Sequence, residues 1–136
     1  MRRASLLAAI IVVASSVSGL AASPFDGRWN VVVSCGAAPD GAKGYRWQFP
    51  ATVKDGVLRG QFRTPGASPS GTLSGRVDAS GDALLTMTGR TGDPDYAIAR
   101  VAGGSPIHYT VRAHLAANSG SGERQEARSC QIGFSR

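Results

Sequence analysis

Long apolar runs, linkers, blocks of like charge and catalytic motifs are missing from most of this 136-residue chain. Beyond the N-terminal region, no stretch has the roughly 20 apolar residues of a membrane-spanning helix, so we expect no integral membrane segment in the mature chain. Without linkers or charge blocks, the chain predicts a single domain. No Gly-x-Ser-x-Gly element or other catalytic motif is present, so we expect no catalytic residues and a protein that is not an enzyme.

The N-terminal region, residues 1–22, predicts a signal peptide that is cleaved. Arg2 and Arg3 precede an apolar core, and small residues follow this core up to Ala22. The core of about eight residues is too short to span a bilayer. The pattern predicts export to the periplasm or the extracellular medium, and a mature domain over residues 23–136.

Potential metal ligands are few, with two histidines and two cysteines in the chain. His108 and His114 lie six residues apart on one predicted strand, and extended chain of that length separates them by roughly 20 Å. Two cysteines in an exported chain are better explained by a disulfide than by a metal site or a thiolate nucleophile. We therefore expect no metal site and no cofactor.

The charge balance gives no sign of a nucleic-acid partner. Removing Arg2 and Arg3 from the 15 basic residues leaves 13 against 9 acidic ones, and the two signs are interspersed. Tyr45, Trp47 and Phe49 alternate with polar residues as in a base-stacking strand, but a buried strand needs the same alternation. Since an exported protein seldom meets nucleic acid, we expect no nucleic-acid partner.

Short segments with alternating apolar and polar residues, separated by glycine and proline, predict an antiparallel all-β fold. The clearest is 45–54, and Asp55-Gly56 after it predicts a hairpin turn. The other predicted strands cover 27–35, 57–64, 72–77, 82–89, 95–101, 107–116 and 123–135.

Two polar segments are interpreted as turns. Asp93 and Asp95 flank Pro94, a pattern that starts a turn more often than it pairs carboxylates for calcium or glycoside chemistry. Asn118 to Gly122 is rich in glycine and serine, but no helix follows it to form a phosphate site. We interpret it as a hairpin loop.

The two cysteines lie near the ends of the predicted domain, and we expect Cys35 and Cys130 to form a disulfide. A bridge there makes the first and last strands neighbours, so the meander of about eight strands closes, or nearly closes, into a small barrel. Several aromatic residues and Ile98 are expected to face inward. A barrel of this size with so many large side chains is expected to be filled.

The segment Gly27-Arg28-Trp29 resembles the start of calycins, the group that includes the lipocalins. The resemblance implies an eight-stranded meander barrel whose first strand opens with Gly-x-Trp. It also implies that a basic residue late in the chain covers Trp29, and Arg136 and Arg128 are the candidates.

A second resemblance covers the whole mature chain. The stretches "FDGRW…C", Gly-x-Leu-x-Gly and "RSCQIGF" resemble a group of small exported β-proteins of Gram-negative bacteria with no assigned activity. This resemblance implies export and a disulfide, and it implies no mechanism.

The sequence thus predicts a monomeric, non-enzymatic binding module for an unknown small ligand, held by loops at one barrel mouth or in a shallow pocket near Trp29. The alternative is an inhibitor or accessory protein of an exported enzyme, acting through loops 36–44 and 65–71. The candidate ligand-binding or barrel-plugging residues are Trp29, Tyr45, Trp47, Tyr109 and Arg136.

Overall fold

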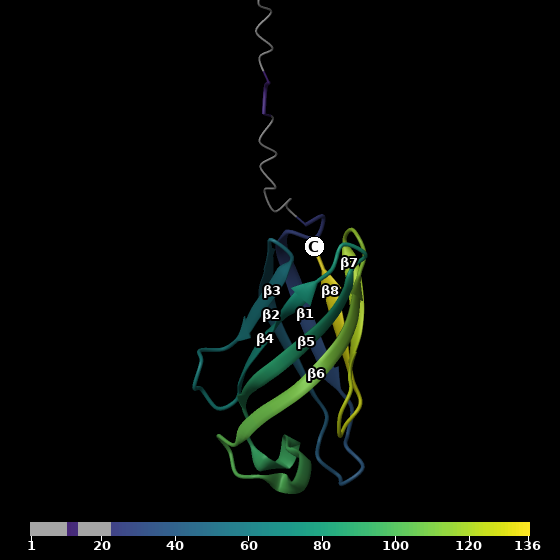
Figure 1. The fold of residues 1–136 in the computed structure, drawn as a ribbon. Helices are drawn as coiled ribbons and strands as arrows, with labels where there is room; N and C mark the ends of the chain where they lie inside the picture. Colours follow the sequence, from purple (N-terminus) through teal and green to yellow (C-terminus); the bar gives the residue numbers. More distant parts are fainter. Residues whose placement is uncertain (1–10, 14–22) are drawn as a thin grey trace, which may run out of the picture.

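The computed structural model describes residues 11–13 and 23–136, so most of the predicted signal peptide lies outside the described residues. Eight antiparallel strands follow one another in chain order, and the last pairs with the first to close a barrel (Figure 1). The all-β meander barrel is therefore confirmed. The strands are β1 (Gly27–Cys35), β2 (Tyr45–Lys54), β3 (Val57–Phe62), β4 (Ser70–Val77), β5 (Asp82–Arg90), β6 (Pro106–Leu115), β7 (Ser119–Arg124) and β8 (Cys130–Ser135).

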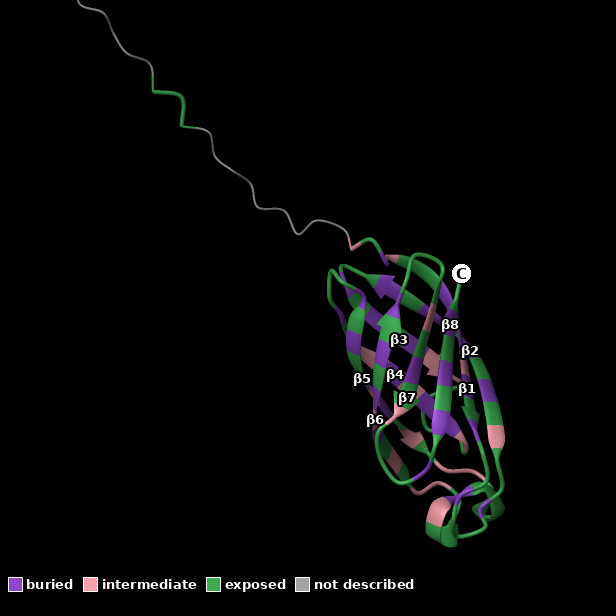
Figure 2. Ribbon diagram, turned by 90° about the vertical axis from the view of Figure 1, so that its right-hand side faces the viewer, coloured by how far each residue is buried: buried purple, intermediate pink, exposed green. Residues whose placement is uncertain are grey.

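Alternation along each strand separates the interior from the surface (Figure 2). In β2, the inward positions from Trp47 to Val53 are buried and the residues between them are exposed. Successive side chains of a strand point to opposite faces, so this sequence pattern suits one face packed inside a barrel and one face in water. Burial of the inward rows is the main favourable contribution to folding.

The barrel closes along the seam between β1 and β8. Val33 lies opposite Ile132, and Cys35 lies opposite Cys130. The two cysteines form a disulfide at the end of this seam, as the sequence predicts. The bond joins the first and last strands, which are 95 residues apart in the chain.

The strand predicted over 95–101 is wrong. This region forms two short 3₁₀ turns, η1 (Pro94–Tyr96) and η2 (Ile98–Arg100), beyond the barrel mouth opposite the C-terminus (Figure 1). The Asp93 side chain accepts a hydrogen bond from the Asp95 N–H (2.9 Å) and so begins the first turn. Ala99 adopts a left-handed backbone conformation, with φ of 58°, which no strand accommodates. Ile98 therefore lies outside the barrel.

The segment predicted as one strand over 123–135 is two strands, β7 and β8, and the predicted loop at 118–122 contains the start of β7. A strand is recognised in a sequence by apolar side chains at its inward positions, and in β7 these positions are Gly120 and Gly122. A Cβ at Gly122 would lie 2.9 Å from the Cβ of Ala113, so the interior has no room for a side chain there. The expected count of eight strands holds because one predicted strand is lost and one is gained.

Candidate functional site

The barrel end that carries Trp29 is plugged. Trp29 is only 2% exposed, and its indole Nε1–H donates to the Phe25 carbonyl at 2.8 Å. The Arg136 guanidinium lies 4.5 Å from the indole ring centroid, a distance typical of a cation–π contact. Its nitrogens also donate to four backbone carbonyls, including those of Pro24 and Ala117. Trp29 and Arg136 thus act as the plug of this end.

The opposite mouth holds a cavity of about 530 Å³ that is open to solvent on one side. It lies between the ends of the strands and residues 91–105, which we call the cap. The interior between the two ends is filled by the buried core, which includes Leu58, Leu73 and Met87, so the cavity lies at the mouth, against one end of this core. The wall side chains Tyr45 and Phe62 are only half-buried, and β7 supplies glycines and an arginine where other strands supply large apolar groups. The lining includes Tyr45, Trp47, Phe62, Tyr96, Ile107 and Arg124.

Three aromatic rings form one wall of the cavity. Trp47 stacks on Phe62, with ring centroids 4.4 Å apart and planes 13° apart. Tyr45 lies next to Trp47 at 5.3 Å in a tilted arrangement. Gly71 leaves space for the indole, since a Cβ there would lie 2.7 Å from the Trp47 ring. The wall offers a flat apolar surface to any molecule in the cavity.

The loop 36–44 is held against the cap by Asp40. Its carboxylate accepts hydrogen bonds from the Ala42 N–H (3.1 Å) in the same loop and from the Ala99 N–H (2.7 Å) in the cap. These two bonds, the Ala99 bond above all, lower the pKa of Asp40 below its usual value. These bonds therefore fix the position of the loop beside the cap.

A second set of contacts joins the same two segments. The Lys43 N–H donates to the Asp95 carbonyl at 2.8 Å. The Asp95 carboxylate lies 3.4 Å from the Arg100 guanidinium and 4.0 Å from the Lys43 ammonium. These ion pairs are exposed, so each contributes little to stability by itself. Of the two, the Lys43–Asp95 contact joins the loop to the cap, while Asp95 and Arg100 both lie within the cap.

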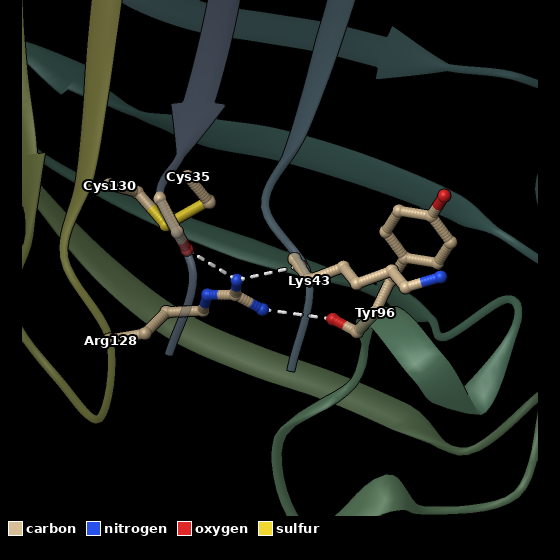
Figure 3. The surroundings of a disulfide bond; sticks show 6 residues. Cys35, Lys43, Tyr96, Arg128 and Cys130 are labelled. Atoms are coloured by element: carbon tan, nitrogen blue, oxygen red, sulfur yellow. Dashed lines mark hydrogen bonds between the residues drawn. A yellow bond between two sulfur atoms is a disulfide. The ribbon is translucent and has the colours of Figure 1, made fainter. Parts of the chain in front are cut away.

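Arg128 ties three segments together beside the disulfide (Figure 3). It is only 5% exposed. Its Nη1 donates to the Tyr96 carbonyl of the cap at 2.9 Å. Its Nη2 donates to the Gly36 and Lys43 carbonyls of the loop, at 2.6 and 3.0 Å. The turn between β7 and β8 is thereby joined to both the loop and the cap.

Two cations at the cavity floor pack against two tyrosine rings. The Arg124 guanidinium lies 4.1 Å from the Tyr109 ring centroid, and that of Arg128 lies 5.2 Å from the Tyr45 ring centroid. Burial raises the pKa of both tyrosines, so both are neutral phenols at pH 7. The two hydroxyls are close enough to affect each other's pKa, yet the Tyr109 hydroxyl has no hydrogen-bond partner of acceptable geometry among the described residues.

The loop 65–71 forms part of the rim. The Ser68 hydroxyl donates to the Thr91 carbonyl, and Pro69 lines the cavity. A Cβ at Gly92 would lie 2.8 Å from Pro69, which shows how closely this loop approaches the cap. The loop is bonded to the cap in the same way as loop 36–44.

The structure thus separates the predicted site residues. Tyr45 and Trp47 lie in the cavity wall and Tyr109 lies beneath the floor, while Trp29 and Arg136 plug the far end. Sequence reasoning missed Arg124 and the cap. No apolar periodicity marks Gly-x-Gly-x-Arg at 120–124 as a strand, so nothing in the pattern aims Arg124 inward.

Comparisons with protein families, with curated proteins and with solved structures each found no match to this chain. Within the described part of the chain, no helix is long and apolar enough to cross a membrane. The cavity, its aromatic wall and its cationic floor are therefore the features that bear on function.

Proposed function

We propose that this protein is a non-enzymatic binding module that holds a small, largely apolar molecule in the cavity between the barrel mouth and the cap. The observation that carries the proposal is the cavity itself, which has a volume of about 530 Å³ and an aromatic wall. Small-molecule sites usually measure about 300–1,000 Å³ and are lined mainly by apolar and aromatic groups with a few polar ones. The cavity has these properties.

Two polar groups at the rim, those of Thr91 and Asp93, favour binding over catalysis because they hold the cap in place. The Thr91 hydroxyl donates to the Ala102 carbonyl at 3.0 Å. The Asp93 carboxylate accepts from the Asp95 N–H. Groups bonded in this way are poor candidates for a nucleophile or a general base, which need a free path to the substrate.

We also propose that binding takes place after export. The signal-peptide pattern at residues 1–22 and the disulfide support this, since disulfides persist in oxidising compartments. A relation to the calycins remains a proposal as well, supported by the Gly-x-Trp start and by Arg136 over Trp29. We also propose, from the sequence stretches quoted above, a likeness to small exported proteins of Gram-negative bacteria.

The proposal is tested with a neutral apolar fluorophore, N-phenyl-1-naphthylamine, which emits strongly only when shielded from water. We expect a saturable rise in emission with one probe bound per chain. Ile107→Trp adds bulk on the inward face of β6 at the cavity lip, and we expect it to weaken binding about tenfold or more. Leu84→Trp places the same indole on the outer face of β5, where Leu84 is 61% exposed, and should leave binding unchanged.

Either of two results would overturn the proposal: no saturable binding by the wild type, or equal binding by the Ile107→Trp and Leu84→Trp variants. An inhibitor that acts through loops 36–44 and 65–71 is the alternative function. Both loops are hydrogen-bonded to the cap, which favours the cavity as the working part of the molecule.

A further inference from the structure

We propose that the bound molecule is an amphiphile with one carboxylate, and that Arg124 on the cavity floor recognises this group. The inference rests on the proposed function and adds the chemical class of the ligand.

Arg124 faces the cavity without a protein partner. It is the last residue of β7 and follows Gly120 and Gly122 on the inward face of that strand. Its Nε is buried with no hydrogen-bond partner, and its guanidinium forms no ion pair with any residue that the structure describes. Buried donors are nearly always satisfied in native structures, so an open guanidinium here points to a partner that the cavity supplies.

Arg136 in the plug and Arg128 beside the disulfide show the contrast. Arg136 donates to four carbonyls in the plug, and Arg128 donates to three around the cap. Both therefore have a structural role through backbone carbonyls, although the Nε of Arg128, like that of Arg124, is buried without a partner among the described residues. Arg124 is held differently, by its face against the Tyr109 ring at 4.1 Å. Such stacking orients the guanidinium plane and leaves its nitrogens free to bond a planar anion.

The floor also has an excess of positive charge. Burial lowers the pKa of Arg124, and the nearby charge of Arg128 lowers it further. The nearby carboxylate of Glu126 offsets part of this charge, but its oxygens accept hydrogen bonds from the N–H and the hydroxyl of Thr110. The Arg124 side chain is half-buried, and a charge taken partly out of water is stabilised by an opposite charge. The neutral phenols of Tyr45 and Tyr109 cannot supply one at pH 7.

The rest of the cavity lining indicates what kind of molecule carries the anion. The stacked rings of Trp47 and Phe62 form an apolar wall above the cationic floor. A molecule that spans both surfaces has an apolar body and one acid end. A carboxylate matches a guanidinium because two parallel N–H···O bonds form between the two planar groups.

The test compares decanoate with decanol, which share an apolar chain and differ in charge at neutral pH. Isothermal titration calorimetry measures both on the full mature protein. We expect the wild type to bind decanoate about tenfold tighter than decanol or more. Arg124→Gln should remove this preference and change decanol binding less than about twofold, because charge-assisted hydrogen bonds are lost and the apolar contacts remain.

Two further variants make the result specific. Arg124→Lys keeps the charge and should retain part of the preference for decanoate. Arg112→Gln removes an exposed arginine from the outer face of β6, next to β7 in the sheet, and should bind both compounds as the wild type does.

A second measurement needs no variant: the preference of the wild type should vanish as the pH falls through the pKa of the decanoate carboxyl group.

The outcomes separate the two proposals. If decanol binds and decanoate binds no tighter, or if Arg124→Gln keeps the preference, the role of Arg124 is overturned and the binding function stands. If neither compound binds, the proposed function is overturned and this inference with it.

Discussion

A single guanidinium, that of Arg128, reaches carbonyl groups of two segments that lie far from it in the chain. It is nearly fully buried, so its charge is stabilised by these carbonyls in place of water. The sequence offers Arg128 only as a late basic residue, one of two candidates to cover Trp29. Its true position depends on where the turn between β7 and β8 places it, and that is set by the whole barrel.

Replacing Arg128 with Met should lower the free energy of unfolding by about 3 kcal/mol, because three part-buried carbonyls lose a charged donor. Arg128→Lys should lose less, since it keeps the charge, but its donors sit on one nitrogen and cannot span the carbonyls that Nη1 and Nη2 reach separately. Urea denaturation measures both, with Arg112→Met as the exposed control. A loss under about 0.5 kcal/mol for Arg128→Met, the usual size of a surface change, would contradict this role.

The carboxylate of Asp40 gives a second expectation at this scale, in its response to pH. Its pKa lies below the usual value of 3.8 in the folded protein, so the unfolded chain binds the proton more readily. The stabilisation is therefore present above about pH 3.8 and is lost as the pH falls through the lower pKa of the folded state. Asp40→Asn should unfold at lower urea than the wild type at neutral pH, and this difference should shrink below pH 3.8. A difference that stays constant with pH would contradict the assignment.

At the scale of elements, the hydrophobic pattern predicts the strands that bury apolar side chains and misses the one that does not. The segment 45–54 alternates fully and is found as β2 almost unchanged. β7 buries glycine, which leaves no period to detect. The prediction for the cap is wrong for the opposite reason. Tyr96 and Ile98 are spaced like the inward residues of a strand, but Asp93 and Pro94 start a turn, and the chain forms a 3₁₀ turn there.

The absence of side chains at the inward positions Gly120 and Gly122 of β7 has a direct test. Gly122→Ala should destabilise the fold by about 1–3 kcal/mol, because the new Cβ would lie 2.9 Å from both the Ala113 Cβ and the Arg112 carbonyl oxygen. Gly133→Ala on the outer face of β8 is the matched control, since nothing lies within 4 Å of a Cβ there. We expect it to be neutral or slightly stabilising. Equal stability of the two variants in urea would show that the interior of β7 is looser than described.

For the molecule as a whole, the sequence predicts closure through two residues. Cys35 and Cys130 place the ends of the sheet together, and the barrel follows from that contact and the strand count. The cavity could not be predicted in this way. It results from the distance between the cap and the mouth, which depends on how Asp40 and Arg128 hold the loop and the cap.

The disulfide should contribute about 4–5 kcal/mol at most, as the chain-entropy model gives for a loop with 95 residues between its ends. The double variant Cys35→Ala, Cys130→Ala should therefore unfold at clearly lower urea than the oxidised wild type. Adding a reductant should lower the wild type to a similar level and leave the variant unchanged. A reductant effect under about 1 kcal/mol on the wild type would indicate that the seam is held by its strands alone.

The placement of the two tryptophans, one at each end of the barrel, gives the protein two intrinsic fluorophores with separate surroundings. Trp29 is enclosed under a guanidinium in the plug, and Trp47 lies in the wall of the cavity. A molecule that enters the cavity perturbs the emission of Trp47 and leaves that of Trp29 as a constant internal standard. The chain contains no other tryptophan, so occupancy of the cavity and integrity of the barrel have distinct optical signatures in one unlabelled sample.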